Sequence, residues 1–522
     1  MGAVSYRIRE IKLSPDDEKK RIPEKICRKL GLEESDILEW KIVRESIDAR
    51  RKPDVKLVYT VDFVCEKEDL LNRKGVKISR TPDETYVMGK CERKPANRPV
   101  IVGSGPCGMF AAYVLAHAGA EPLVLEQGAP MDRRVKDVEK FWKEGVLDTR
   151  SNVQFGEGGA GTFSDGKLTT GIKDVRVRKI LEVFAAAGAG EKILYSSRPH
   201  IGTDVLRKVV VALREEIKAL GGTYMFDTKM SDIIIEDGAV RGVETESRDG
   251  DRQVIPADHV ILAPGHSSRD TLRMLAEKHI PMEQKPFSMG VRVQHLQSVI
   301  DRAQYGDEKL AEKLGPADYK LNHRCEDGRG VYTFCMCPGG EIVRASSEEG
   351  GVVVNGMSYS DRGGKYANSA LLADIKTSDF GSDDPLAGVS LQEKYERLAY
   401  ENGGSDYSAP ETLWKYFKEK SPEAGPVCDS LPGYVTDAII EAMPHLGRKL
   451  KGFDDPGTLM VAIESRSSSP VRILRDRESL QSVKGLYPSG EGAGYAGGIV
   501  SAAADGMKAA EKVISSINSS DE

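Results

Sequence analysis

The sequence has little that would tie it to a membrane. No apolar run among its 522 residues approaches the roughly 18 to 20 residues that span a bilayer. The opening stretch, MGAVSYRIREIKLSPDD, lacks the apolar core of a secretory signal peptide. It also carries Tyr6 where an N-myristoylation motif needs Ser or Thr. We therefore expect a cytoplasmic protein with no membrane partner.

Cysteine is scarce, and neither sign of charge is in large excess. The eight cysteines are scattered along the chain, with neither the C-x-x-C of a redox pair nor a C-x-x-x-x-C after the first glycine motif. Reduced thiols are therefore expected rather than a disulfide framework. The formal net charge of −6 gives no general attraction to nucleic acid, so no nucleic-acid partner is expected.

Changes in composition and periodicity along the sequence predict three domains. The overall class is predicted to be α/β. Residues 1–95 combine strand-like alternation with one amphipathic helix, which is typical of a small α+β domain. Residues 97–285 and 455–518 are predicted to form one discontinuous, Rossmann-like domain, since they show its strand, helix, strand order. The intervening residues 286–454 lack that order and are predicted to be an inserted, mostly β substrate or cap domain. A polar segment with two prolines, residues 90–99, is interpreted as a linker.

A glycine-rich motif opens the predicted Rossmann-like domain. Gly103, Gly105 and Gly108 form G-x-G-x-x-G between a predicted strand and a predicted helix. They would supply a tight turn, close approach of backbone to a pyrophosphate, and close packing of helix on strand. Glu126 ends the next strand, where a carboxylate accepts hydrogen bonds from ribose hydroxyls. The motif predicts that a dinucleotide is bound by Gly103, Ser104, Gly105, Pro106, Cys107, Gly108, Glu126 and Gln127.

A second stretch of small residues lies near the C-terminus. Of the 17 residues in GEGAGYAGGIVSAAADG, from Gly490 to Gly506, 11 are Gly or Ala. A nicotinamide dehydrogenase needs no second turn of this kind, whereas the longer FAD needs backbone contact at its flavin end too, so FAD is predicted. The stretch resembles the closing motif of glutathione-reductase-like flavoproteins, which implies cofactor contacts from Gly490, Glu491, Gly497, Gly498 and Ile499 and a helix N-terminus aimed at the flavin. The alternative is a Gly/Ala helix that packs closely on a neighbour.

Several longer segments together resemble one family, the uncharacterised FAD-dependent dehydrogenases, often labelled NAD(FAD)-utilising dehydrogenases. They are GSGPCG with Glu126, RSNVQFGEGGAGTFSDGKL, RPHIGTD, LAPGHSSRD, TFCMCPGGEIV and SGEGAGYAGGIVSAAADG. The resemblance covers nearly the whole chain. It implies a glutathione-reductase-like FAD domain, a second domain over the flavin, and oxidoreductase activity on an unsettled substrate.

The loop FGEGGAGTFSDGK, residues 155–167, is too rich in glycine for a surface loop with a structure of its own. Its equivalent in related flavoproteins lies along the pyrophosphate and flavin. This resemblance implies backbone contacts to the cofactor from Gly158, Gly159 and Gly161, and Gly265 in LAPGHSSRD is assigned to the cofactor in the same way.

Lys167, Arg466 and Arg472 are the candidate catalytic residues. Lys167, like Arg150, could reach the flavin or the phosphates, and a solvated side chain is an equal alternative. Arg466 and Arg472 bracket SSSPV just upstream of the closing motif, where they could contact an anionic substrate or the reduced ring. The alternative for both is an interdomain hydrogen-bond network. His266, beside the LAPG motif, is interpreted as a structural histidine.

The sequence also contains four residues of the types that bind zinc. They are His323, Cys325, Cys335 and Cys337. The segment YKLNHRCEDGRGVYTFCMC predicts a hairpin with its turn at EDGRG, which pairs Cys325 with about Val331. Cys335 and Cys337 would then lie on the order of 13 to 20 Å away, at about 3.3 Å per residue. Zinc needs its ligands within about 2.3 Å of one point, so no metal site is expected, and a thiol facing the flavin stays open as an alternative.

The leading functional hypothesis is an FAD-dependent oxidoreductase that uses hydride transfer at flavin N5 on an unidentified small-molecule substrate. No second complete G-x-G-x-x-G unit is present, so NADH or NADPH is expected only as a transient reductant. One alternative is a flavin-dependent RNA-modifying enzyme that uses the basic run RESIDARRK, residues 44–52, although acids interrupt that run and a solvated surface explains it better. Another alternative is a non-catalytic, FAD-binding redox sensor.

Overall fold

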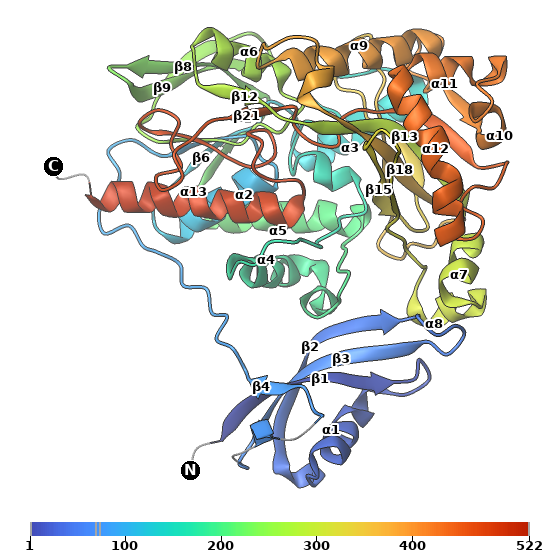
Figure 1. The fold of residues 1–522 in the computed structure, drawn as a ribbon. Helices are drawn as coiled ribbons and strands as arrows, with labels where there is room; N and C mark the ends of the chain where they lie inside the picture. The colour runs from blue at the N-terminus through green and yellow to red at the C-terminus, as the bar shows by residue number, and fades with distance from the viewer. Residues whose placement is uncertain (1–2, 68–69, 73–74, 520–522) are drawn as a thin grey trace.

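The structure is a computed structural model that describes residues 3–67, 70–72 and 75–519. A small N-terminal domain protrudes from a larger body, which contains a five-stranded and a six-stranded sheet (Figure 1). The two parts are in contact, since the Ser197 N–H donates to the Glu45 carbonyl at 2.8 Å. Between Arg80 and Val100 the chain forms neither helix nor strand, as expected for a linker. This segment passes the end of the C-terminal helix α13 (Ile499–Ser519), where the Glu92 N–H donates to Asn518 Oδ1 at 2.9 Å.

The N-terminal domain is an antiparallel sheet packed against one helix. Its strands, in sheet order, are β2 (Ile37–Asp48), β3 (Lys56–Cys65), β1 (Val4–Leu13) and β4 (Ile78–Arg80). Helix α1 (Ile22–Leu30) buries Ile22 and Ile26 against this sheet and ends at Gly31, whose φ of 66° closes the helix. The sequence pattern predicts β1, α1 and β3, but not the edge strand β2.

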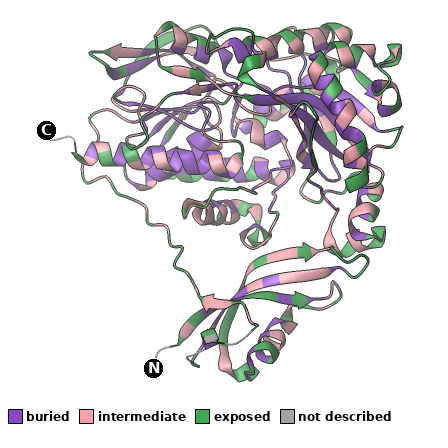
Figure 2. Ribbon diagram, in the orientation of Figure 1, coloured by how far each residue is buried: buried purple, intermediate pink, exposed green. Residues whose placement is uncertain are grey.

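The central sheet of the body is parallel, as a Rossmann-like domain requires. Its strands, in order, are β22 (Leu486–Pro488), β11 (Val260–Leu262), β5 (Val100–Val102), β6 (Leu123–Leu125) and β7 (Thr223–Met225). Helices α2 (Pro106–His117), α5 (Thr203–Ala219) and α13 share one core with Ile101 of the sheet. Figure 2 shows α13 buried along much of its length. The predicted α/β class and Rossmann-like domain are confirmed.

Two smaller sheets and three helices complete this part of the body. The opposite side of the parallel sheet, including Val100 and Val102, packs on a three-stranded antiparallel sheet. The strands of that sheet are β10 (Arg252–Pro256), β9 (Ala239–Ser247) and β8 (Thr228–Glu236). A two-stranded sheet pairs β12 (Met282–Gln284) with β21 (Val471–Ile473). The further helices are α3 (Met131–Glu144), α4 (Arg176–Phe184) and α6 (Arg269–Glu277).

The inserted segment forms a second, antiparallel sheet. Its strands, in order, are β14 (Asn322–Arg324), β15 (Gly330–Cys337), β18 (Tyr366–Ile375), β13 (Phe287–Leu296), β20 (Leu459–Glu464) and β19 (Glu411–Leu413). A separate hairpin pairs β16 (Glu341–Arg344) with β17 (Val354–Met357). Because β20 belongs to this sheet, the sheet extends beyond the predicted boundary at residue 454.

The inserted segment is also less β-rich than predicted. Its helices are α7 (Gln297–Tyr305), α8 (Ala311–Leu314), α9 (Ala387–Asn402), α10 (Trp414–Phe417), α11 (Gly425–Asp429) and α12 (Gly433–Lys449). Val291 and Leu371 of the sheet pack with Ile439 and Met443 of α12 in one core. The reason is that a sheet must bury one apolar face against another layer, and here helices supply that layer.

The hairpin that carries the cysteines differs from its predicted register. His323, not Cys325, lies opposite Val331, and Cys325 begins the turn. The Gly328 N–H donates to the Cys325 carbonyl at 2.9 Å, which closes a tighter turn than the five-residue EDGRG segment suggests. The hairpin itself is present as predicted.

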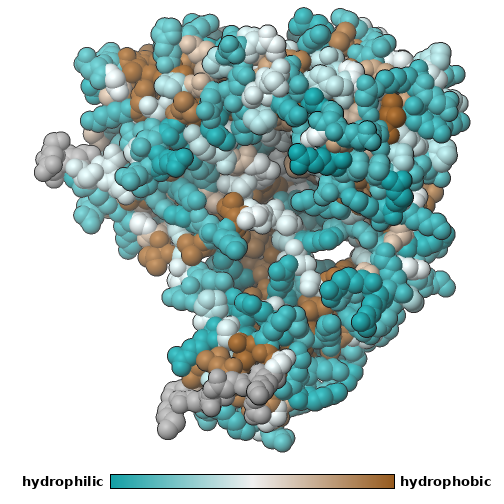
Figure 3. Space-filling model, in the orientation of Figure 1, coloured by the Kyte–Doolittle hydropathy of each residue, from teal (hydrophilic) through white to brown (hydrophobic). Residues whose placement is uncertain are grey.

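Within the described ranges, no helix is both long and apolar enough to cross a membrane. The face shown in Figure 3 is predominantly hydrophilic, and its apolar atoms form separate patches.

Candidate functional site

A cavity of about 350 Å³ lies between the parallel sheet and the antiparallel sheet. Most of the predicted site residues line it: Gly103, Ser104, Gly105, Pro106, Cys107, Glu126, Gln127, Gly159, Gly161, Lys167, Gly265, Arg466, Glu491, Gly497, Gly498 and Ile499. Four predicted residues are not part of the lining: Gly108, Gly158, Gly490 and Arg472. The fold therefore brings segments from both ends of the chain to one place.

The three glycines of the first motif have different surroundings. A Cβ on Gly108 would collide with the carbonyl of Gly103, so this glycine permits α2 to pack on β5. Gly103 itself has φ of 98° and lies against the Ala263 carbonyl. The nearest atom to a Cβ on Gly105 would be the Gly159 Cα, at 3.8 Å. Gly105 therefore leaves open space in the cavity, next to the N-terminus of α2.

Glu126 braces the turn at the base of the cavity. Its Oε2 accepts from the Ser104 N–H at 3.0 Å and from the Ser104 hydroxyl at 2.7 Å. Its Oε1 accepts from the N–H groups of Gly128 and Gly156, at 2.9 and 3.0 Å. A carboxylate offers about four acceptor positions, and protein donors occupy that number here. The predicted bond from Glu126 to a ribose hydroxyl stays a prediction.

The glycine-rich loop lies against the first motif. A Cβ on Gly159 would come within 2.9 Å of the Gly105 Cα, and one on Gly161 within 3.2 Å of Ile499. Gly158 instead faces Val210 of α5, so it supports the loop rather than the cavity. Buried Arg134 of α3, which sequence reasoning missed, also holds this loop and donates to three carbonyls, including that of Asn152 at 3.0 Å.

The C-terminal small-residue stretch has two roles in the structure. Gly497 and Gly498 have no neighbour near a Cβ position and line the cavity immediately before α13 begins. Further along, a Cβ on Gly506 would collide with the Cys107 carbonyl, and one on Gly490 would lie 2.8 Å from the Cys107 Cβ. The turn is therefore open toward the cavity, and the helix also packs closely on α2.

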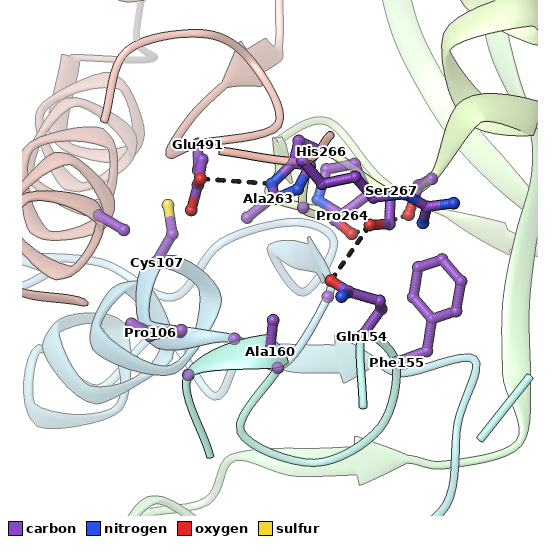
Figure 4. Close-up of a pocket in the computed structure, with 18 of the residues that line it drawn as sticks. Pro106, Cys107, Gln154, Phe155, Ala160, Ala263, Pro264, His266, Ser267 and Glu491 are labelled. Atoms are coloured by element: carbon purple, nitrogen blue, oxygen red, sulfur yellow. Dashed lines mark hydrogen bonds and ion pairs between the residues drawn. The ribbon is translucent and has the colours of Figure 1, made fainter. Parts of the chain in front are cut away.

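His266 lies above the small residues of the cavity and faces Glu491 (Figure 4). Its Nδ1 lies 3.3 Å from Glu491 Oε1. Its Nε2 is buried and has no hydrogen-bond partner within the described chain. Nearby, the Ser267 hydroxyl donates to Gln154 Oε1 at 3.2 Å. A buried polar atom without a partner next to a cavity is suited to bind a ligand.

At the other end of the cavity, the antiparallel sheet contributes a buried ion pair. Arg292 of β13 is fully buried and donates to Glu464 Oε2 of β20 at 2.6 Å and to the Cys335 carbonyl at 2.8 Å. Burial raises the pKa of Glu464 to about 7, and the charge of Arg292 opposes this rise. Glu464 lines the cavity, and a carboxyl group with a raised pKa in a cavity is a candidate acid or base.

Cys335 lines the same end of the cavity. The neighbouring thiol of Cys337 lowers the pKa of Cys335, and the cations Lys167 and Arg292 act in the same direction. These groups favour the thiolate form of Cys335, at the end of the cavity that Glu464 also lines.

The candidate cations are engaged in ion pairs. Lys167 Nζ lies 3.0 Å from Asp165 Oδ2 and donates to the Met336 carbonyl. Arg362 donates to the same carboxylate at 2.6 Å. Burial opposes ionisation of Asp165, but these two cations outweigh it and lower its pKa. Arg150, by contrast, donates to the Ser247 carbonyl at 2.8 Å and does not line the cavity.

Arg466 belongs to a buried network between the two larger domains. It donates to Glu396 Oε2 at 2.7 Å, and Arg269 donates to Glu396 Oε1 at 2.8 Å. Burial opposes ionisation of Glu396, but the two guanidinium groups outweigh it and lower its pKa. Arg472 is different, because it is partly exposed, pairs with Glu283 at 3.1 Å and lies outside the lining.

Sequence reasoning missed Glu464, Arg292 and Glu396 as members of the site. A signal existed for Glu464, because it opens the segment ESRSSSPVR in which only the arginines were singled out. Arg292 and Glu396 lie in ordinary strand and helix patterns. Arg292 pairs with Glu464 across 172 residues of sequence, and Glu396 pairs with Arg466 across 70 residues. No local sequence pattern reveals either pair.

Comparison with known proteins places these features in a family. A protein of Clostridium beijerinckii, described as an uncharacterized protein, is 43% identical to this chain over 533 residues, covering 98% of this chain and 99% of that protein. The chain belongs to the family of that protein. Residues 195–295 match the family model for an FAD binding domain, and residues 286–467 match that for an FAD-dependent protein, C-terminal domain-like. Residues 5–64 match a domain of unknown function.

Solved structures show more distant likenesses. A flavin-dependent brominase mutant has 13% identity and a TM-score of 0.40, with 81% of each chain covered. Glycine oxidase from Bacillus cereus has 12% identity and a TM-score of 0.35, with 80% of this chain and 95% of that chain covered. Glycerol-3-phosphate dehydrogenase from Bacillus halodurans, complexed with FAD, has 12% identity and a TM-score of 0.35, with 82% and 65% covered. Likenesses at this level identify no substrate.

The protein is thus a flavoprotein, and FAD is its cofactor. The cavity fits this cofactor on two observations of its own. Gly105, Gly497 and Gly498 leave open space beside helix N-termini, where phosphate and flavin oxygens are stabilised. The buried Nε2 of His266 lacks a partner within the described chain.

Gly105 offers a direct test of the cofactor contact. Its φ of −70° suits any residue, so Gly105→Val should fold normally while its side chain enters the cavity. We expect FAD affinity to fall at least tenfold, which is about 1.4 kcal/mol, in titrations of the FAD-free protein. In contrast, Gly108→Ala should destabilise folding by about 1–3 kcal/mol in urea unfolding, because its Cβ meets backbone. Unchanged FAD affinity in Gly105→Val would contradict the assignment.

Glu396→Gln tests the buried network. The substitution leaves Arg269 and Arg466 buried without their shared counter-charge, so the free energy of unfolding should fall by about 3–5 kcal/mol in urea denaturation. The control is Glu401→Gln on the same helix, where the side chain is exposed and a change within about 0.5 kcal/mol is expected. Equal stability of the two variants would show that the network does not hold the domains.

Proposed function

We propose that this protein is an FAD-dependent dehydrogenase or reductase of the glutathione-reductase-like type, acting on a small-molecule substrate. The observation that supports this most is the continuity of the cavity. It runs from the glycine turn after β5 to Phe334, Cys335 and Glu464 on the antiparallel sheet. One end suits the cofactor, and the other offers ionisable groups to a substrate.

Bound FAD supplies a two-electron centre, which in this proposal takes part in hydride transfer at flavin N5. Oxidation of a carbon that bears a hydroxyl or amine also releases a proton, which a nearby base must accept. Glu464 has this role in the proposal, because burial raises its pKa to about 7 and it lines the cavity. Arg292, 2.6 Å away, holds the carboxylate in place.

Lys167 and Arg466 serve as positioning residues in this proposal. Lys167 Nζ is held between Asp165 and the Met336 carbonyl, and so fixes the strand that carries Cys335. Arg466 is anchored by Glu396 and donates to the Ser347 hydroxyl at 2.6 Å. Arg472 has no place in the proposed chemistry, since it pairs with Glu283 outside the cavity lining.

An RNA-modifying activity has less support. Within the basic run 44–52, Glu45 pairs with Lys19 at 2.6 Å and Asp48 pairs with Arg50 at 2.7 Å. Lys52 donates to the carbonyl of Ala303 in the larger body. The two acids of the run offset half of its four positive charges, so we propose no nucleic-acid partner. A redox sensor is the second candidate function. Catalytic turnover of a substrate would distinguish an enzyme from a sensor.

The absorption spectrum tests the proposal most directly. The protein purified without added cofactor should carry FAD, and anaerobic NADH or NADPH should bleach the flavin band if either is the transient reductant. A yellow protein that responds to neither nicotinamide, nor to a panel of hydroxy acids and amino acids, would favour the sensor. A protein that neither contains FAD nor accepts it would contradict the proposal entirely.

The role of Glu464 predicts a pH dependence. As a base it must be ionised, and its pKa is raised, so the rate of flavin reduction by substrate should rise with pH through about 7. Glu464→Gln should lower this rate by about 10² to 10⁴-fold and abolish the inflection, while the flavin spectrum is retained. Stopped-flow reduction across pH measures both effects.

Two controls make this test specific. Glu411→Gln on the neighbouring strand β19 is exposed and should leave the rate and profile unchanged. Cys335→Ser removes the thiolate that raises the pKa of Glu464, so the inflection should persist but move to lower pH. An inflection near 7 in Glu464→Gln would rule out Glu464 as its source.

A further inference from the structure

A second group of ligand-type side chains lies at the edge of the antiparallel sheet. His323 is on β14, Cys325 begins the turn to β15, and Glu441 is on α12. One potential ligand atom from each lies within 4.8 Å of those from the other two. Cys335, which lines the cavity, is on the order of 15 Å further along β15 than Gly330, at about 3.3 Å per residue.

We propose that His323, Cys325 and Glu441 bind a Zn²⁺ ion that fastens helix α12 to the β14–β15 hairpin. Imidazole, thiolate and carboxylate are all established zinc ligands, and the thiolate disfavours Mg²⁺ and Ca²⁺. Three protein ligands leave the fourth tetrahedral position to water. In this proposal the role of the ion is structural, because its ligands join two elements of one domain and none of them lines the cavity.

The distances are close to those that zinc requires. Zinc–ligand bonds of about 2.0 to 2.3 Å place tetrahedral ligand atoms roughly 3.3 to 3.8 Å apart. His323 Nε2 and Glu441 Oε1 are already 3.6 Å apart. The Glu326 N–H donates to Glu441 Oε1 at 2.9 Å, which keeps the carboxylate against the hairpin. All three ligand atoms lie within 4.8 Å of one another, so side-chain movements of about 1 Å would bring them to the separations that zinc needs.

The fold holds these ligands in place before any ion binds. The Cys325 N–H donates to the Arg329 carbonyl at 2.9 Å within the tight hairpin turn. Glu441 and His445 lie one helical turn apart, so both face the hairpin. The ring of His445 stacks on that of His323 with 3.9 Å between centroids, which restricts rotation of the ligand imidazole.

The charges of the cluster also favour a cation. A divalent ion would balance the charge of the Glu441 carboxylate and of a thiolate at Cys325. Cys325 is buried, whereas His323 and Glu441 are partly exposed, so an ion can reach the cluster from solvent.

This site differs from the one that the sequence analysis rejected. That set joined His323 and Cys325 to Cys335 and Cys337, which lie at the other end of β15. The missing ligand comes from a helix more than 100 residues later, since Glu441 is 115 positions beyond Glu326. Sequence spacing alone does not reveal it.

The FAD-loaded protein, freed of metal with a chelator, should bind one Zn²⁺ per chain when zinc is returned, as measured by elemental analysis after gel filtration. Zinc should also raise the temperature of unfolding, because it binds the folded state. Co²⁺ in place of Zn²⁺ should give visible d–d bands of tetrahedral strength at wavelengths beyond the flavin absorption.

Cys325→Ser and Glu441→Gln should each weaken zinc binding at least about 100-fold. The matched control is Cys428→Ser, a free cysteine on α11 outside the cluster, which should bind zinc as the parent does. Retained flavin absorbance shows that each variant is folded. If Cys325→Ser does not fold, zinc binding by Glu441→Gln and the Co²⁺ bands of the parent protein test the proposal instead. Failure of the parent to bind zinc, or unchanged binding in either ligand variant, would overturn the proposal.

Discussion

The structure depends on the close approach of backbone segments that are distant in sequence. Around the base of the cavity, the turn at Gly103 touches the Ala263 carbonyl, Gly492 would bring a Cβ against Gly265, and Gly506 lies on the Cys107 carbonyl. At each of these glycines, a Cβ atom would collide with the neighbouring backbone. The parallel sheet, α2 and the C-terminal segment therefore pack against one another at the base of the cavity. The same lack of side chains leaves the space that FAD needs.

Buried ion pairs at this cavity join the two larger domains, alongside apolar contacts such as those of Phe163 and Val153 with Ala345. Asp165 of the glycine-rich loop binds Arg362, and Glu396 of the inserted segment binds Arg269. Replacing buried ion pairs by apolar residues is often neutral or stabilising, so such pairs are weak evidence for stability. Breaking one partner is costly, however, and the geometry of these pairs is directional. They are therefore suited to fixing how the antiparallel sheet lies over the cofactor site.

Local patterns predicted the elements of the fold, but not the contacts between them. The order β5, α2, β6 was predictable because strand and helix periodicities and the glycine motif lie within 30 residues of each other. The helices α9 and α12 were not predicted, because the inserted segment lacks the strand, helix, strand order of a Rossmann-like domain, and that absence does not exclude helices. The apolar residues Val435, Ile439 and Met443 of α12 do recur at helical spacing. Glu464 and Arg292 became site residues only through pairing of β13 with β20. Such pairing is set by the packing of the whole sheet.

The hairpin β14–β15 shows why residue type alone does not assign chemistry. Its two ends carry cysteines in opposite electrostatic surroundings: burial and Glu441 raise the pKa of Cys325, whereas the Cys337 thiol and the cations Lys167 and Arg292 lower the pKa of Cys335. Cys335 and Glu464 line the same end of the cavity, and Arg292 donates both to the Glu464 carboxylate and to the Cys335 carbonyl. The chemistry that each thiol can support therefore follows from the cations and carboxylates that the fold packs against it, and not from its place in the hairpin sequence.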